Sequence, residues 1–209
     1  MHNETSLTAL PATEVIAETA ATLISSRRTI LPKRLTLPAP DEDAMAQIFA
    51  AAAAAPDHGQ LLPWRFVLIP VSERHRLGQV FVDALMERDK TASDLELNRA
   101  REKAERAPVL MLAVVDAVCG DPAIDLSERL ISAGCAIQNM LLMATALGFG
   151  SALTSGKALK STALRTLFHL SKSEHAVCFI SLGSVGSTKR TSTRPDAHAF
   201  VTTLPQEPK

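Results

Sequence analysis

The chain has 209 residues, of which 46% are hydrophobic and only 4% aromatic, and its 22 basic residues balance its 22 acidic ones. This length suits one domain whose core is built from aliphatic side chains rather than from aromatic rings. A zero net charge argues against the broad positive field that attracts nucleic acid or an anionic membrane surface.

Cysteine usage and the lack of long apolar runs predict a cytoplasmic protein. Cys119, Cys135 and Cys178 lie far apart and form neither a CxxC motif nor a zinc-type pairing with histidine, which argues against disulfides and a structural metal. Residues 1–12 do not resemble a secretory signal, and no apolar run reaches the roughly 18 residues of a membrane span. We expect tails at 1–12 and 204–209 around a single domain, 13–203.

Hydrophobic spacing predicts two helices at the start of this domain. Thr13 to Ser26 repeats apolar residues at helical intervals and is followed by Arg27 and Arg28. Asp41 to Ala55 repeats the pattern more clearly, with Asp41 at its start and Pro56 after its end.

Strands and helices alternate through the middle of the chain. Alternating residues predict a strand over Trp64 to Ile69, and continuous apolar residues predict a central strand, covered on both faces, over Val109 to Val115. Between them, Ser72 to Asp89 has helical periodicity, and Asp94 to Arg106 is typical of a charged, solvated helix.

The stretch from Asp125 to Leu147 is apolar nearly all round and ends at Gly148, a residue type common after helix C-termini. A helix of this length spans about 35 Å. That is long for the core of one domain, so we expect a second subunit to bury one side of it and the protein to be a homodimer.

The last predicted elements are short. They are a strand at Ser151 to Ser155, a helix at Ser161 to Phe168 and a strand at Ala176 to Leu182. From Gly183 onward the sequence is polar with little pattern.

Three short segments could hold a ligand. Arg27-Arg28-Thr29 could clamp a phosphate, although basic residues at the end of a helix also simply complement its dipole. Ala55-Pro56-Asp57-His58 could aim a histidine toward the next strand, or be an ordinary surface loop. Leu153-Thr154-Ser155-Gly156 offers small side chains and backbone N–H groups where a planar ligand could lie. Rossmann, P-loop, serine-hydrolase and HExxH motifs are absent from the sequence.

The order of these segments resembles the nitroreductase family of FMN enzymes, and most closely its small YdjA-like branch. The shared features are the Arg-Arg-Ser/Thr segment, the Ala-Pro-Asp-His turn, Pro63-Trp64 before a strand, Ser132-Ala133-Gly134-Cys135, Gly148-Phe149-Gly150 and Thr154-Ser155-Gly156. The likeness runs from about Glu14 to Val201. It implies an α+β fold with a central, mostly antiparallel sheet surrounded by helices.

The resemblance also implies roles for individual residues. Arg27 and Arg28, with Thr29 where a serine is usual, would meet the phosphate and ribityl chain of FMN. His58 would approach the flavin, from the opposite subunit. Leu153, Thr154 and Ser155 would line the ring or its tail, and Gly156 would let the backbone come close.

At two positions the chain departs from its branch. Ala54 and Thr154 both stand where related sequences carry an arginine, so a polar contact to the flavin or to a second ligand is absent or replaced. Lys189 and Arg190, nearer the C-terminus, could supply charge for the phosphate instead.

The resemblance implies an oxidoreductase that passes electrons from NAD(P)H through FMN to nitroaromatics, quinones or other small acceptors by a ping-pong mechanism. The flavin would perform the redox step, so no catalytic acid, base or metal is assigned. Two alternatives remain open at this stage, a flavin-binding or flavin-carrier protein with little turnover and a helical interaction protein without a cofactor.

Overall fold

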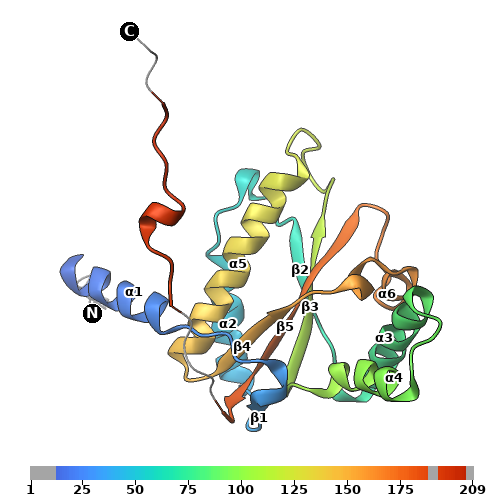
Figure 1. The fold of residues 1–209 in the computed structure, drawn as a ribbon. Helices are drawn as coiled ribbons and strands as arrows, with labels where there is room; N and C mark the ends of the chain where they lie inside the picture. The colour runs from blue at the N-terminus through green and yellow to red at the C-terminus, as the bar shows by residue number, and fades with distance from the viewer. Residues whose placement is uncertain (1–12, 188–192, 206–209) are drawn as a thin grey trace, which may run out of the picture.

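Five strands form one antiparallel sheet with helices against both faces (Figure 1). A computed structural model of the chain describes residues 13–187 and 193–205. Every strand pair in this sheet is antiparallel, as predicted, and the strand order is β1-β5-β3-β2, with β4 also paired to β5. The strands are β1 (Leu35–Thr36), β2 (Trp64–Leu68), β3 (Val109–Asp116), β4 (Gly150–Thr154) and β5 (Glu174–Val185).

The helices lie close to their predicted positions. The described helices are α1 (Thr13–Ser26), α2 (Glu42–Ala53), α3 (Arg74–Arg88), α4 (Asp94–Arg101), α5 (Leu126–Ala146) and α6 (Thr162–Leu167). The charged helix predicted to run to Arg106 is shorter, because after Arg101 the chain tightens into the 3₁₀ turn η4 (Glu102–Glu105). Gly148 follows α5 with a φ of +83°, the left-handed conformation that ends many helices.

The C-terminal half of the sheet differs from the expectation. The sequence predicts little pattern after Gly183, yet β5 continues to Val185, where it pairs with the short strand β1. A two-residue strand is too short to produce a hydrophobic period, so β1 could not be found from the sequence. The pairing also supplies the partner that keeps the last residues of β5 extended.

Side chains alternate along the central strands and build a core on each face of the sheet. On β5, Ile180 and Leu182 face α5 and α2, whereas Phe179 faces α3 and α6. Along β3, Met111 belongs to the first core and Leu112 to the second. Both residues are fully buried, which confirms the prediction of a central strand covered on both faces.

Two buried arginines hold loops rather than carboxylates. Arg129 on α5 is only 1% exposed and donates hydrogen bonds to the carbonyl oxygens of Cys119 and Asp121 at 2.7 Å and of Ile124 at 2.9 Å. Arg74, at the start of α3, reaches three carbonyls in the same manner. Each guanidinium satisfies backbone oxygens that irregular segments leave free inside the protein.

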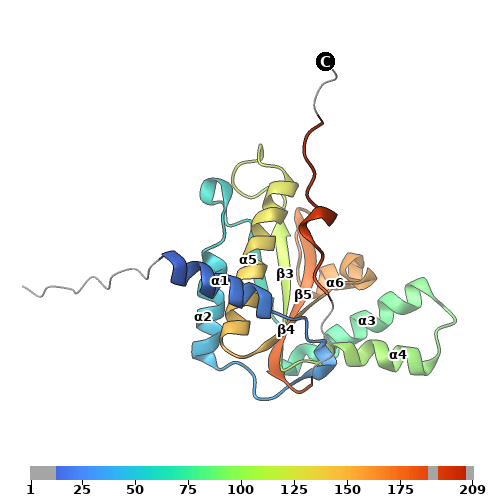
Figure 2. The same cartoon turned by 60° about the vertical axis from the view of Figure 1, so that its left-hand side comes forward.

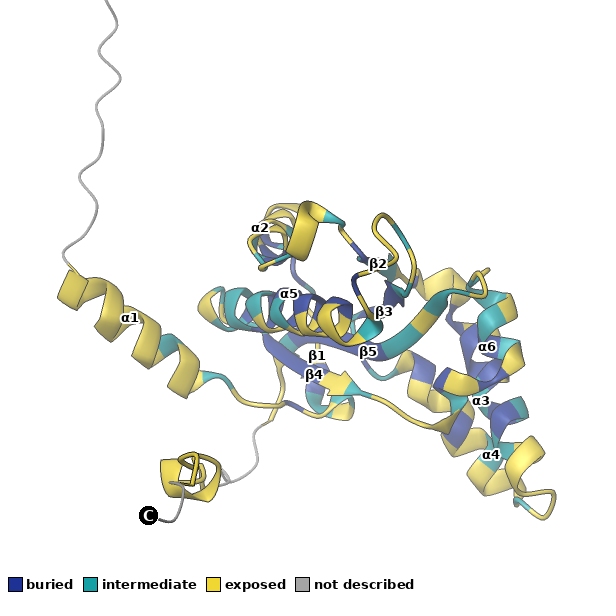
Figure 3. Cartoon of the chain, turned by 90° about the horizontal axis from the view of Figure 1, so that it is seen from above, coloured by how far each residue is buried: buried dark blue, intermediate teal, exposed yellow. Residues whose placement is uncertain are grey.

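Helix α1 stands apart from the sheet. None of its residues is buried, and Figure 3 shows it projecting from the body and exposed over most of its length, while Figure 2 shows the same helix turned toward the viewer. Helix α5 also leaves one side uncovered in the single chain, with Ile131 66% exposed. The sequence analysis expects a second subunit to bury one side of this helix, and a single chain does not test that expectation. The predicted tail 1–12 lies outside the described residues, and so does 206–209.

We expect Arg129→Met to lower the free energy of unfolding by about 3 kcal/mol or more, because several buried carbonyls lose their donor. Urea denaturation monitored by circular dichroism measures this change. The matched control is Arg76→Met, since Arg76 is exposed and its one ion pair among the described residues is with Glu73, and it should change stability by less than about 1 kcal/mol. Similar losses in the two variants would contradict the role given to Arg129.

Candidate functional site

The end of β4 lies between two concavities on opposite faces of the sheet. Leu153 pairs with Ile180 and so faces α5, whereas Thr154 pairs with Phe179 and faces α3. Thr154 and Ser155 line both concavities. The sequence places Leu153 and Thr154 in one site, and the strand places their side chains on different faces.

The first concavity, the α5 hollow, has a volume of about 360 Å³. It is lined by Gly134, Ile137, Gln138, Leu153, Thr154, Ser155, Val177 and Cys178. Burial raises the pKa of the Cys178 thiol to about 11, so this wall is uncharged at neutral pH. The hollow offers an apolar surface with the hydroxyl of Ser155 and the amide of Gln138 beside it.

Two glycines leave open space at the α5 hollow and at the strand end. A Cβ atom at Gly134 or at Gly156 would meet no other atom within 4 Å. Gly134 lies in the middle of α5, where glycine costs about 1 kcal/mol relative to alanine. Nothing within the described chain requires this glycine, and its absent side chain leaves room at the surface of the helix.

The second concavity, the α3 cavity, has a volume of about 470 Å³. Its inner wall is mainly apolar and includes Phe81, Leu85, Leu110, Leu159 and Phe179. Five cationic residues also line it, Lys33, Arg88, Lys103, Arg106 and Lys157. Sequence analysis did not single out these residues, because they come from five different elements or connections.

The Arg27-Arg28-Thr29 segment runs beside the start of β4. Thr29 forms a parallel bridge with Ser151, and the Ile30 N–H donates to the Ser151 carbonyl at 2.9 Å. From there the chain continues in the same direction as β4 and reaches the wall of the α3 cavity at Leu31. The structure thus brings a predicted phosphate segment and a predicted ring-binding strand side by side.

Three guanidinium groups gather at this segment. Arg194 donates to the Arg27 carbonyl at 2.8 Å, and Arg28 donates to the carbonyls of Arg27 and Ser25. Burial first, and then the charges of Arg194 and Arg28, lower the pKa of Arg27 below its ordinary value. The depression therefore reports partial burial first and the neighbouring positive charges second. Neither Arg27 nor Arg28 lines the α5 hollow or the α3 cavity.

Sequence reasoning missed Arg194, because it lies in an aperiodic segment far from Arg27 along the chain. The sequence analysis names Lys189 and Arg190 as a further source of charge for the phosphate, and both lie outside the described residues.

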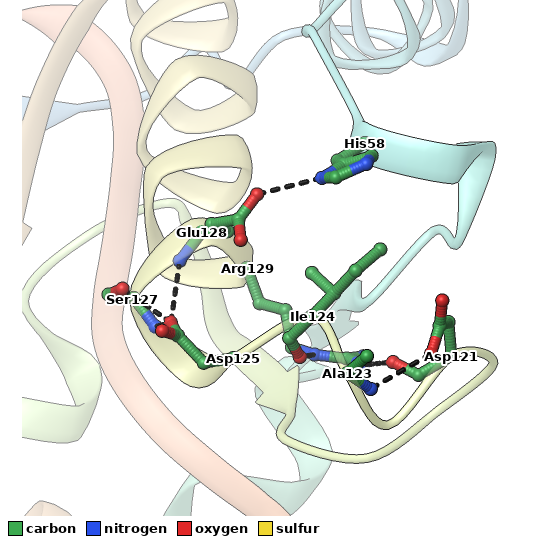
Figure 4. A network of polar contacts seen from close by, with 8 residues as sticks. All are labelled: His58, Asp121, Ala123, Ile124, Asp125, Ser127, Glu128 and Arg129. Carbon is green, nitrogen blue, oxygen red and sulfur yellow. Dashed lines mark hydrogen bonds and ion pairs between the residues drawn. The ribbon is translucent and has the colours of Figure 1, made fainter.

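His58 lies away from the two concavities, in the 3₁₀ turn η2 (His58–Gln60). Its Nδ1 atom is 2.8 Å from the Glu128 carboxylate at the start of α5, where Asp125 accepts hydrogen bonds from the N–H groups of Ser127 and Glu128 (Figure 4). The imidazole is 65% exposed. Ala54, at the C-terminal end of α2, is exposed as well and lines neither concavity.

The turn that carries His58 has an unusual backbone. Gln60 and Leu62 have φ values of +51° and +47°, which non-glycine residues rarely adopt. The carboxylate of Asp57 accepts a hydrogen bond from the Leu62 N–H at 2.6 Å and closes the turn. Local contacts therefore hold this loop in shape and keep the imidazole at the surface.

Within one chain the predicted residues fall into two groups. One group lies around β4 and consists of Thr29 and residues 153–156, with Arg27 and Arg28 immediately before Thr29 in the chain. The other group, Ala54 and His58, lies away from β4. Across 13–187 and 193–205, no cluster of three potential metal ligands occurs, and no helix is long and apolar enough to cross a membrane.

Comparison with known proteins agrees with this architecture. The model of the Nitroreductase family matches residues 24–184. A Haemophilus influenzae protein named "Putative NAD(P)H nitroreductase" is 33% identical over 189 residues, which cover 88% of this chain and 99% of the relative. "Putative NAD(P)H nitroreductase YdjA" of Escherichia coli K12 is 32% identical over 184 residues, covering 88% and 98% of the two chains.

Solved structures share the fold at lower identity. A nitroreductase-like family protein from Bacillus cereus superimposes with a TM-score of 0.73 at 17% identity, over 88% of this chain and 95% of the other. A Desulfovibrio desulfuricans protein, described as a putative nitroreductase in complex with FMN, gives 0.67 at 23% identity, over 95% and 100%. With the family model covering most of the chain and relatives above 30% identity along nearly their whole length, this protein belongs to the nitroreductase family.

Proposed function

We propose that the protein is an FMN-dependent oxidoreductase that passes electrons from NAD(P)H to small acceptors such as nitroaromatics or quinones by a ping-pong mechanism. The observation that carries the proposal is the bridge between Thr29 and Ser151. It places an arginine-rich segment at one end of β4, while an open hollow lies at the other end. Relatives named as NAD(P)H nitroreductases and solved neighbours crystallised with FMN support the assignment.

The phosphate end of FMN would lie at Arg27, Arg28 and Thr29, and we add Arg194 to this set. Burial first, and then repulsion by Arg194 and Arg28, lowers the pKa of Arg27, and a phosphate dianion would relieve that repulsion. From Ser151 to Ser155 an extended strand covers about 13 Å. A ribityl phosphate followed by a flavin ring is long enough to run along that distance.

The flavin ring would lie at the α5 hollow. Leu153 and Ser155 border it from β4, Gly156 leaves space beside the backbone, and Gly134 leaves space on α5. The fit is one of shape and polarity, since an apolar wall would contact the ring and the few polar groups at its edge would orient it. Arg165 does not replace the arginines absent at Ala54 and Thr154, because it bonds to the carbonyls of Ser171 and Glu174.

When bound, FMN would supply the redox chemistry, and the residues of this chain would supply binding and orientation. The uncharged hollow would exclude water from one face of the ring and leave the other face for donor and acceptor in turn. We assign no side chain as a proton donor. His58, held by Glu128, is proposed to approach the ring of the opposite subunit, because within its own chain it lies apart from β4.

The proposed active form is a cytoplasmic homodimer whose single domain spans 13–203. Two surfaces support this assembly. Helix α1 buries none of its residues although it carries Val15, Ile16 and Ile24, and α5 exposes Leu130 and Ile131. A large apolar surface on a folded chain is typical of a protein interface. A single-chain mass of 22.4 kDa in light scattering would contradict this proposal.

The proposed activity predicts a yellow protein after purification. Adding NADH or NADPH without oxygen should bleach the flavin band, and adding a quinone or a nitroaromatic should restore it. Double-reciprocal plots at several acceptor concentrations should be parallel, because donor and acceptor occupy the site in turn. Bleaching without recovery by either acceptor would instead indicate a flavin carrier, and a colourless protein that takes up no FMN would reject the proposal.

The phosphate assignment predicts a difference between FMN and riboflavin. Arg27→Ala and Arg194→Ala should each weaken FMN binding about tenfold and change riboflavin binding by less than about threefold, because only FMN carries the phosphate. Quenching of flavin fluorescence on titration of the apoprotein measures both constants. Arg34→Ala, in a basic turn outside the three-arginine cluster, is the control. Equal losses for both flavins would mean that these arginines act on the fold.

The ring assignment predicts that the space at Gly134 is needed for FMN. Gly134→Leu should lower FMN affinity at least about tenfold by filling the hollow, whereas the apoprotein keeps its helix content because leucine favours helices. Gly134→Ala is the control at the same position. It adds only one methyl group and should lower FMN affinity less than Gly134→Leu does. Full FMN affinity in Gly134→Leu would place the ring elsewhere.

A further inference from the structure

The α3 cavity combines an apolar inner wall with positive charge that the described chain does not neutralise. Lys33, Arg88, Lys103, Arg106 and Lys157 contribute to its lining, and no aspartate or glutamate does. Over 13–187 and 193–205, none of these five cations has a carboxylate within 4.0 Å. In a chain of zero net charge, this is a local concentration of one sign and favours an anionic ligand.

The inner wall favours a ligand with an aromatic body. Phe81, Ala84, Leu85 and Arg88 follow the i, i+3, i+4, i+7 spacing and form one face of α3, with Phe179 opposite on β5. The volume of about 470 Å³ falls within the range of small-molecule sites. In addition, the buried Ser181 hydroxyl in this wall has no hydrogen-bond partner within the described chain, so the wall has unused polar capacity.

The cavity adjoins the proposed flavin site across the end of β4. Thr154 and Ser155 line both spaces, and the position beside Gly156 is open. A ligand that crosses this strand end could place one end at the flavin and the other among the five cations. A reduced nicotinamide dinucleotide has this form, with a ring that delivers hydride at one end and a phosphorylated adenosine at the other.

We infer that the α3 cavity binds the adenylate end of the nicotinamide donor and makes the protein prefer NADPH to NADH. The inference rests on the proposed function, because it assigns the donor of that reaction. The additional 2′-phosphate of NADPH is the group that a cluster of unneutralised cations distinguishes from a hydroxyl. Lys103 from η4 and Lys157 from η5 (Lys157–Lys160) approach the cavity from two different elements.

The direct test uses a redox-inactive probe, so that binding is separated from turnover. Oxidised, FMN-loaded protein is titrated with 2′,5′-ADP and with 5′-AMP by isothermal calorimetry. We expect 2′,5′-ADP to bind about tenfold more tightly than 5′-AMP, and Lys103→Glu and Lys157→Glu each to weaken 2′,5′-ADP about fivefold. The ratio of kcat/KM for NADPH to that for NADH should fall by a similar factor in each variant.

Lys160→Glu is the matched control, because Lys160 is exposed in the same turn as Lys157 and does not line the cavity. It should change 2′,5′-ADP binding by less than about twofold. Equal binding of the two nucleotides, or equal effects of Lys157→Glu and Lys160→Glu, would overturn the inference. Loss of FMN from Lys103→Glu would overturn it as well, because the flavin itself would then occupy the cavity.

Failure of this inference differs from failure of the proposed function. If NADH and NADPH reduce the flavin with the same kcat/KM, the inferred preference for NADPH is wrong, but the proposed oxidoreductase activity is supported. If neither nucleotide reduces FMN-loaded protein, the proposed function fails, and the 2′,5′-ADP titration still decides whether the cavity binds a phosphorylated nucleotide.

Discussion

The pairing of β4 with the middle of β5 is the constraint on which both proposed sites depend. Successive residues of a strand point to opposite faces, so this register fixes Leu153 on the α5 side and Thr154 on the α3 side. A shift by one residue would exchange them. Because β5 is itself paired along β3 and covered on both faces, the strand end is held rigidly between two concavities. Ligands on the two faces would therefore approach each other at Thr154, Ser155 and the open position beside Gly156.

Long-range polar contacts hold the irregular segments around this frame. Arg129 satisfies carbonyls of the 116–124 connection from within α5, and Glu128, one residue earlier, contacts His58. The first turns of α5 thus contact two loops at once, one through a buried guanidinium and one through an exposed contact between a carboxylate and an imidazole. The buried contact serves stability, because its acceptors are inaccessible to water. The exposed contact contributes little to stability, and instead orients an imidazole that is free to meet another molecule.

Charge in this protein is organised locally. Equal numbers of acidic and basic residues exclude a broad field, yet cations gather at the start of β4 and around the α3 cavity. Each group combines residues that are far apart in the sequence. The first brings Arg27 next to Arg194, and the second brings together Lys33, Lys103 and Lys157. Net charge therefore argues only against a broad positive field of the kind that attracts nucleic acid, and it says nothing about small anionic ligands.

Local pattern alone determined most of the helices and the central strands, because apolar periodicity reports which faces must be buried. The order of short motifs was enough to indicate the family. Three features that hydrophobic periodicity does not predict were decided by the tertiary structure. They are the two-residue strand β1, the extension of β5 to Val185 and the side of α5 that stays uncovered. It also decided which predicted residues meet, since Thr29 reaches Ser151 through a bridge that no local rule encodes, whereas His58 lies apart. Contacts between distant segments depend on how the whole chain packs, and a single sequence contains no local signal for them.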